Sequence, residues 1–233
     1  MSILENIYES TLKFLEPLTP DETYKKVVNE AIKLINGDSG RIFMSSRNGF
    51  DSVYSSSSDM PLPNPRKKGN VYKSFISNKA MIVHTNEVKD TYPQLRKIGI
   101  RSIMYVPLSN VGVVYGVLVI RSKEDRRFAG NELSVMKLFG SLASLAIRKA
   151  QLYEETKIAA DTRDLFISLA AHELRTPLTT LMGYVQLVLA RLKNKKTVDL
   201  KWIYEIALEA NRLKALINEF LEINRIRTGK VQY

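Results

Sequence analysis

The stretch Ser102-Ile-Met-Tyr-Val-Pro-Leu108, followed by Val111-Gly-Val-Val-Tyr-Gly-Val-Leu-Val-Ile120, decides the fold of the N-terminal half. Both runs are rich in β-branched and aromatic residues, which favours two consecutive strands. Working outward, Arg41–Met44 and Val53–Tyr54 predict another strand pair separated by Asn48-Gly49, and Ala80–Val83 predicts a further strand. We therefore expect a sheet built largely from strand pairs that follow one another in the sequence.

Helical patterns surround these strands. The first runs from Ile3 to Leu15, and after the break at Leu18-Thr-Pro20 a second begins at Asp21 and ends at Asn36-Gly37. Short helices are predicted at 71–76 and 93–98, a loop over 55–68, and a long helix from Asn131 onward. This order predicts an α+β fold in which residues 1–150 form an α/β sandwich.

The segments 102–108 and 116–120, with Phe128, Glu132-Leu133 and the helix 138–153, resemble the C-terminal half of a GAF domain. The resemblance covers roughly residues 3–153 and implies a sensor domain with an antiparallel sheet. Because GAF domains bind chromophores, cyclic nucleotides, haem, small metabolites or nothing, the ligand remains unknown.

Several ligands are disfavoured by the residues present. The chain has no cysteine, which excludes the usual covalent bilin attachment, and it lacks the Asn-Lys-x-n-Phe-x-x-x-Asp-Glu pattern of cyclic-nucleotide GAF domains. His84 follows a predicted strand, where a lone histidine is more often structural than a haem or metal ligand. The aromatic residues are candidates either for a pocket lining or for the core: Phe43, Tyr54, Tyr72, Phe75 and Tyr105.

The composition excludes other classes. The 233 residues carry a net charge of +11, but the Lys and Arg residues are scattered and match no nucleic-acid-binding signature. No window is apolar enough for a membrane span, and the N-terminus has no signal-peptide layout. We therefore expect a cytoplasmic protein without nucleic-acid partners. The positive charge is predicted to be solvated surface, or to attract an acidic protein partner.

The long helix carries an apolar stripe spaced by seven residues, and its companion positions turn polar after Leu142, at Lys149, Thr156 and Arg163. This pattern predicts either a marginal dimeric connector over 151–165 or a helix packed on the first domain. The stripe consists of Leu138, Leu145, Leu152, Ala159 and Phe166.

Further along, a second register places His172 outside the apolar seam. Spacings of four and three join the seam residues Ile167, Ala171, Leu174, Leu178, Leu181, Val185, Val188 and Leu192. Glu173 follows His172 directly, Thr176 lies one turn further on the same exposed side, and Pro177 should bend the helix. After a polar turn, a second helix begins near Asp199. Two such hairpins predict a homodimeric four-helix bundle over 166–228.

This geometry favours nucleophilic chemistry at His172. An exposed neutral imidazole is a competent nucleophile near pH 7, and the Glu173 carboxylate can orient it or accept a proton. A metal site would need a second ligand at helical spacing, and the helix has none, so no metal is predicted. There is also no nucleophile elbow for a hydrolase. Phosphoryl acceptance fits best.

The motif His172-Glu-Leu-Arg-Thr-Pro177 is similar to the H-box of HisKA-type sensor histidine kinases, in their dimerisation and histidine-phosphotransfer (DHp) domain. The resemblance covers about residues 158–228. It implies that His172 accepts the γ-phosphoryl of ATP and passes it to an aspartate of a response regulator. It further implies that Glu173 is the acid/base, that Thr176 positions water for regulator dephosphorylation, and that Pro177 permits a bend.

The chain departs from the family after residue 228. The tail 229–233 stands where an ATP-binding domain would begin, and no Asp-x-Gly-x-Gly or P-loop motif is present. We therefore expect no autophosphorylation in cis, with ATP and magnesium belonging to a separate catalytic domain. The chain is then a kinase fragment or a natural phosphotransfer protein. The alternative function is a non-catalytic GAF dimerisation or ligand-binding module.

Overall fold

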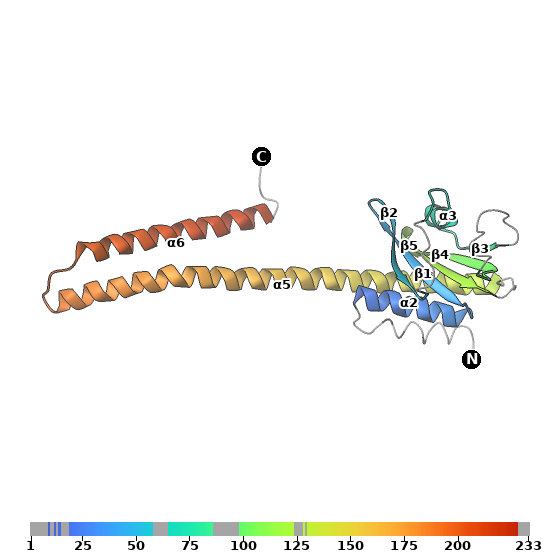
Figure 1. Ribbon diagram of the computed structural model, residues 1–233, viewed down its shortest axis with the longest axis horizontal. Helices are drawn as coiled ribbons and strands as arrows, with labels where there is room; N and C mark the ends of the chain where they lie inside the picture. The colour runs from blue at the N-terminus through green and yellow to red at the C-terminus, as the bar shows by residue number, and fades with distance from the viewer. Residues whose placement is uncertain are drawn as a thin grey trace. The chain divides into compact units, whose positions relative to one another are not determined.

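The computed structural model describes residues 9, 12, 14, 19–57, 65–85, 98–123, 128 and 130–227, with the backbone alone over 223–227. The chain divides into two compact units, Met1–Thr156 and Lys157–Tyr233 (Figure 1). The predicted helical segments at 3–15 and 93–98 fall almost entirely outside the described residues, as does the tail 229–233.

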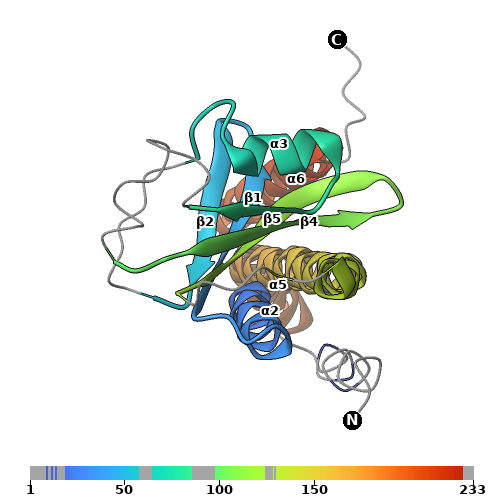
Figure 2. The ribbon, with the colours of Figure 1, turned by 90° about the vertical axis from the view of Figure 1, so that its right-hand side faces the viewer.

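The first unit contains a five-stranded antiparallel sheet with strand order β2-β1-β5-β4-β3. Its strands are β1 (Ser39–Ser46), β2 (Gly49–Ser55), β3 (Met81–His84), β4 (Ser102–Asn110) and β5 (Val113–Ser122). The helix α3 (Asn70–Ser77) covers one face, while α2 (Pro20–Leu34) and the start of α5 (Gly130–Lys193) cover the other (Figure 2). The predicted α+β sandwich with an antiparallel sheet is confirmed.

Local signals in the sequence account for the ends of α2. Thr19 caps its N-terminus, and Glu22 reciprocates by accepting from the Thr19 backbone N–H at 2.9 Å. At the other end Asn36 adopts a left-handed conformation (φ 55°), and the Gly37 N–H donates to the Ile32 carbonyl at 2.9 Å. A Cβ on Gly37 would lie 2.5 Å from a methyl carbon of Ile120, so this position requires glycine.

Both predicted hairpins form, but their turns are displaced from the expected positions. The β1–β2 turn is Arg47-Asn48, and Gly49 is already the first residue of β2, paired with Ser46. Val111, expected to begin a strand, instead forms the β4–β5 turn with Gly112, and both have positive φ (47° and 81°). A two-residue turn with both residues left-handed matches the twist of the strands it joins.

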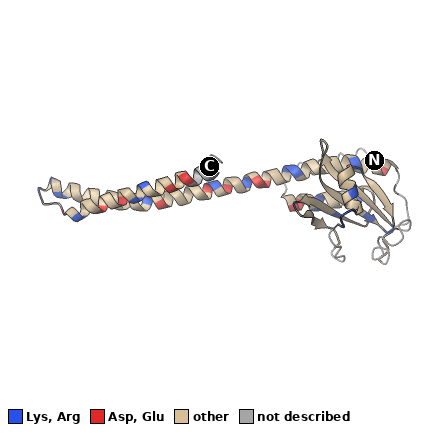
Figure 3. Cartoon of the chain, turned by 90° about the horizontal axis from the view of Figure 1, so that it is seen from above, with Lys and Arg blue, Asp and Glu red and all other residues tan. Residues whose placement is uncertain are grey.

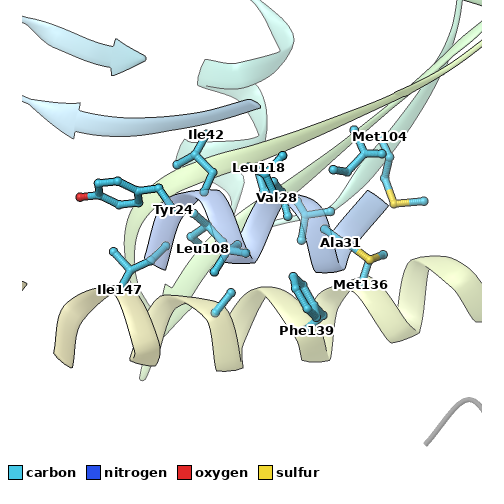
Figure 4. Packing of buried hydrophobic residues seen from close by; sticks show 14 of the residues in the cluster. Tyr24, Val28, Ala31, Ile42, Met104, Leu108, Leu118, Met136, Phe139 and Ile147 are labelled. Atoms are coloured by element: carbon cyan, nitrogen blue, oxygen red, sulfur yellow. The ribbon is translucent and has the colours of Figure 1, made fainter. Parts of the chain in front are cut away.

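The main core lies between the sheet and the helices α2 and α5 (Figure 4). The helix α5 spans Gly130–Lys193, and its first part contributes Met136, Phe139, Ala143 and Ile147 to this core. A smaller cluster packs under α3 on the opposite face. The leucines of the predicted seven-residue stripe point away from the main core, because Leu138, Leu145 and Leu152 remain nearly half exposed.

The second unit is an antiparallel helical hairpin. The helix α6 (Leu200–Arg227) returns along α5, as shown by ring contacts between Phe166 and Phe220 at one end and between Arg191 and Trp202 at the other. Between the helices, Lys195 is left-handed (φ 51°) and the Asp199 carboxylate accepts from the Lys201 N–H at 2.9 Å. The predicted hairpin and the helix start near Asp199 are confirmed.

Candidate active site

His172 lies on the exposed surface of the hairpin. Its side chain is 73% exposed, while Leu174, Pro177 and Leu181 of the same helix are turned toward α6 and at least half-buried. Since an α-helix turns about 100° per residue, His172 lies on the side of α5 that faces away from α6. The predicted exposure of the imidazole therefore agrees with the structure, and a large reactant can reach it.

Glu173 approaches the imidazole from the next position on the helix. The Nδ1 atom of His172 lies 3.5 Å from Oε1 of Glu173, an ion-pair distance longer than a typical hydrogen bond. Both side chains are exposed, so solvent screens this contact and a small side-chain rotation can close it. When Nδ1–H donates to the carboxylate, the lone pair of Nε2 points outward, free to attack.

Thr176 is directed back along its own helix. Its hydroxyl donates to the His172 carbonyl at 3.5 Å, at the long limit of a hydrogen bond. The sequence correctly predicts that Thr176 lies one turn beyond His172 on the exposed side. The hydroxyl does not face the imidazole in this conformation, so handling a water there would require a different rotamer.

Pro177 interrupts the backbone ladder of α5, because its nitrogen cannot donate to the Glu173 carbonyl. The helix nevertheless continues through Pro177 to Lys193 (Figure 1). Thr179 and Thr180 donate to the carbonyls of Arg175 and Thr176 at 2.8 and 3.2 Å, a pattern that loosens and bends helices. The sequence analysis did not single out these two threonines, although two threonines directly after Pro177-Leu178 indicate a place where the helix can bend. The bend itself stays a prediction.

The remaining candidates lie in the first unit. His84 ends the edge strand β3 opposite Ser102. Within the described parts of the chain, no cluster of three His, Cys, Asp or Glu side chains could hold a metal ion. Five aromatic residues were candidates for a pocket lining or for the core. Phe43, Tyr72, Phe75 and Tyr105 belong to the cluster under α3, whereas Tyr54 packs against the core on the opposite face.

Two arginines on the α3 face were not anticipated from the sequence. Arg41 lies over the Phe43 ring at 5.8 Å, and Arg121 is four residues beyond Val117, another member of the cluster under α3. Both are buried, and desolvation together with the nearby Arg41 charge lowers the pKa of Arg121 to about 10. Both arginines stand within otherwise apolar predicted strands, and this pattern could have indicated from the sequence that they are buried.

Charge is spread over the molecule rather than gathered at the histidine. Lys and Arg alternate with Asp and Glu along α5 and α6 (Figure 3). No helix of the described residues is both long and apolar enough to cross a membrane. The surface around His172 is thus solvated and carries charges of both signs. The imidazole and the adjacent Glu173 carboxylate are the groups on it that are suited to nucleophilic and acid/base chemistry.

Two protein families match the chain in the order that the sequence predicts. The GAF domain family matches residues 19–147, more than half of the chain, and the His Kinase A (phospho-acceptor) domain family matches residues 162–229. The chain therefore belongs to the GAF family and carries a His Kinase A domain after it. This is the arrangement of the sensory and phosphoacceptor portion of a two-component histidine kinase.

Curated relatives agree with this assignment. The circadian input-output histidine kinase CikA of Synechococcus elongatus is 24% identical over 63% of this chain, and the sensor protein VanS of Enterococcus faecium is 27% identical over 47% of it. The matched region spans only 23% and 28% of those two proteins. The GAF domain of a Coxiella burnetii phosphoenolpyruvate-protein phosphotransferase has the same fold, with a TM-score of 0.56, 15% identity and coverage of 66% of this chain and 96% of that one.

Proposed function

We propose that His172 is the phosphoacceptor of a two-component relay. A catalytic domain outside this chain would transfer the γ-phosphoryl group of ATP to His172, and His172 would pass it to an aspartate of a response regulator. The observation that carries the proposal is the exposed imidazole with a carboxylate 3.5 Å from its Nδ1 atom, within a His Kinase A domain. ATP and magnesium would be held by the separate catalytic domain.

In the first transfer, from ATP to the chain, His172 is the nucleophile and Glu173 accepts the proton. Nε2 of His172 attacks the γ-phosphorus of ATP, a nitrogen–phosphorus bond forms, and the bond to the bridging oxygen breaks as ADP leaves. The proton on Nδ1 passes to the Glu173 carboxylate, so that the ring finishes neutral. In the second transfer, the regulator's aspartate oxygen attacks the same phosphorus and the imidazole is the leaving group.

Thr176 would act in the reverse direction by positioning a water molecule against the phosphorylated regulator. Its present hydrogen bond to the His172 carbonyl is long and easily exchanged. Pro177 would permit the bend that brings the hydroxyl and the imidazole into different arrangements for the two activities.

The hairpin would work as a homodimer, because it has an apolar face that its own chain does not cover. On both helices this face lies beside the contact between α5 and α6, displaced in the same rotational sense. Since the helices are right-handed and antiparallel, the two displaced stripes meet on one side of the hairpin. A second hairpin packed there completes a four-helix bundle. The exposed residues are Ile167, Leu178 and Met182 on α5, and Ile203, Ile217 and Leu221 on α6.

The GAF domain would supply the signal. It has a self-contained core and is joined to the histidine by α5, which is a single helix from Gly130 to Lys193. A ligand bound on the α3 side of its sheet would shift or rotate α5, and α5 would carry this movement to the hairpin. The ligand itself stays unassigned.

The decisive experiment is phosphate transfer to or from the chain. Purified chain would be incubated with ATP, magnesium and an added histidine kinase catalytic domain, or with a phosphorylated regulator, and assayed for acid-labile, base-stable phosphate. We expect His172→Ala to abolish the label. His84→Ala removes the only other histidine and should leave it unchanged. Labelling that survives in His172→Ala, or is absent from wild type under every condition, contradicts the proposal and favours a non-catalytic dimerisation module.

A second variant separates the two directions of transfer. Thr176→Ala should lower dephosphorylation of the regulator about tenfold or more while leaving phosphate acceptance by His172 within about twofold, as expected for one lost general catalyst. Thr179→Ala is the matched control on the same helix. Equal loss in both directions would mean that Thr176 only maintains the helix.

A further inference from the structure

The turn that joins α5 to α6 carries a concentration of positive charge (Figure 3). Between residues 190 and 204, five side chains are cationic and a single one, Asp199, is anionic. All five cations are exposed, and none forms an ion pair within the described part of the chain. The Asp199 carboxylate accepts from the Lys201 N–H at 2.9 Å, at the start of α6. The cations are Arg191, Lys193, Lys195, Lys196 and Lys201.

The helix ends account for only two of these cations. Arg191 and Lys193 stand in the last turn of α5, where the helix dipole is negative and favours positive charge. Arg191 also lies over the Trp202 ring at 5.8 Å, a contact that joins the two helices. Lys201 stands in the first turn of α6, where the dipole favours acidic residues, and that turn contains none. The position of Lys201 is therefore electrostatically unfavourable for the helix.

The turn also holds a lysine in a conformation that favours glycine. The Lys196 N–H donates to the Arg191 carbonyl at 2.9 Å and the Lys195 N–H to the Leu192 carbonyl at 3.0 Å, the two hydrogen bonds of a Schellman motif. Lys195 occupies the left-handed position of this motif (φ 51°), which glycine adopts without the steric cost that a Cβ brings. The local fold therefore explains neither Lys195 nor Lys201, since both stand against the preference of their positions.

Two large apolar side chains follow the charged turn. Leu200 and Tyr204 are 72% and 75% exposed. Each lies two residues from Trp202, which faces α5, so at about 100° per residue both lie on the side of α6 away from α5. Ile203, on the proposed dimer face, is about 60° and 100° away from them around the helix. Leu200 and Tyr204 thus stand beside the proposed dimer face and not on it.

We infer that the turn of the hairpin docks onto an anionic bilayer surface, with its lysines among the lipid phosphates and with Leu200 and Tyr204 in the interface. Clustered cations are attracted to anionic headgroups, and the apolar stems of lysine can lie along the surface while the ammonium groups stay solvated. A leucine and a tyrosine beside such a cluster add apolar burial at the boundary between headgroups and acyl chains. The contact requires no spanning helix.

The shape and the chemistry of the turn favour lipid over an acidic protein. The turn at the end of a helical hairpin is convex, so a folded partner would have to present a hollow of matching shape, whereas a fluid bilayer adapts to it. Four of the five cations are lysines, and the fifth, Arg191, is engaged with Trp202. A lysine ammonium is a hydrated point charge that suits mobile headgroups, while fixed carboxylates favour the planar fork of arginine.

Docking at the turn leaves His172 accessible. The histidine lies about 20 residues before the end of α5, which is about 30 Å along a helix that rises 1.5 Å per residue. The inference is independent of the phosphotransfer proposed above, because it uses no residue assigned to that reaction.

Co-sedimentation of the full chain with vesicles tests the inference. Wild type should bind vesicles of equal parts phosphatidylcholine and phosphatidylglycerol, should not bind phosphatidylcholine alone, and should dissociate as salt is raised. Removing three charges from the turn should lower the partition coefficient about 100-fold. This turn variant combines Lys195→Gln, Lys196→Gln and Lys201→Gln.

A matched control removes the same charge from the GAF unit. It should bind within about threefold of wild type, because its charges lie outside the proposed contact. Lys68 in this control shares the left-handed conformation of Lys195. The control combines Lys67→Gln, Lys68→Gln and Lys73→Gln, which are all exposed.

Trp202 reports where the lipid lies, because it is the only tryptophan of the chain and stands in the first turn of α6. Vesicles with brominated acyl chains should quench its fluorescence in wild type and in the control, but not in the turn variant. Leu200→Ala should lower vesicle binding about tenfold, since it removes part of the apolar burial. Circular dichroism should show unchanged helicity in all these variants, whose altered side chains are exposed.

Three outcomes would overturn the inference. Wild type that does not bind anionic vesicles at low salt has no such surface. Equal binding by wild type and the turn variant, or binding without quenching of Trp202, would place the lipid contact elsewhere. Binding of duplex DNA that the turn variant loses, without vesicle binding, would identify a polynucleotide as the partner. The turn variant should accept phosphate at His172 as wild type does, so failure of the vesicle experiment and failure of phosphotransfer are separate results.

Discussion

The two units of this chain treat their apolar residues in opposite ways. The GAF unit buries large side chains such as Ile42, Met104, Leu118 and Phe139 almost completely within its own fold. The hairpin buries only Pro177 among its described residues and leaves apolar side chains exposed on both helices. One unit therefore covers its apolar residues within its own fold, while the other leaves an apolar face for the second copy that we propose. Under that proposal, an independently folded sensor acts on a bundle whose packing is still adjustable.

The largest expected effect lies in the GAF core. Phe139→Ala removes a fully buried ring between α5 and the sheet and should lower the free energy of unfolding by about 3–5 kcal/mol. Urea unfolding followed by circular dichroism measures this. The neighbouring Leu138→Ala, on the exposed side, should cost less than about 1 kcal/mol in dilute solution. Equal effects would show that the GAF unit is not self-sufficient.

The hairpin should respond through association rather than folding. Leu178→Asp removes about 1–2 kcal/mol of apolar burial in each copy, which corresponds to a dimer dissociation constant raised about 30- to 1000-fold. Analytical ultracentrifugation measures this constant. Leu169→Asp is the matched control, an exposed leucine half a turn away from the outer face. If Leu169→Asp dissociates the dimer and Leu178→Asp does not, the predicted interface lies on the wrong face.

A backbone contact in the sheet offers a smaller effect of a different kind. A Cβ on Gly116 would lie 2.3 Å from the Phe43 carbonyl oxygen and 2.8 Å from the Met44 sulfur. Gly116→Ala should therefore separate β1 from β5 and cost about 1–3 kcal/mol. Gly183→Ala, in the hairpin, meets no atom within 4 Å and should be neutral or slightly stabilising. Thermal unfolding of both variants checks the contrast.

The smallest effect concerns the N-terminus of α2. Thr19→Ala removes the cap and should cost about 0.5–2 kcal/mol. Hydrogen bonds from the Thr19 N–H and hydroxyl lower the pKa of Glu22, so this carboxylate stabilises the fold above its ordinary pKa and loses that contribution as the pH falls through the lowered value. The stability difference between wild type and Thr19→Ala should therefore shrink in acid. A pH-independent difference would contradict this linkage.

Local patterns in the sequence predicted most of the architecture. The β-branched and aromatic residues of 102–120 predicted the central strand pair, and the Thr19-Pro20 and Asn36-Gly37 signals placed the ends of α2, because these features depend on neighbouring residues only. The exposure of His172 could be predicted for the same reason, because it follows from the spacing of apolar residues along one helix. The displaced turns at Arg47-Asn48 and Val111-Gly112 were missed because the strand pairing, not the glycine signal, decides which residues turn.

The sequence by itself determined the periods, the caps and the reactive motif. The tertiary structure decided which face of each element is covered: it placed Tyr54 in the core opposite the other aromatics, buried Arg41 and Arg121, and turned Leu138, Leu145 and Leu152 away from the sheet. A period shows that a helix has an apolar face. What covers that face depends on elements distant in the sequence and, for the hairpin, on the second copy of the chain that we propose.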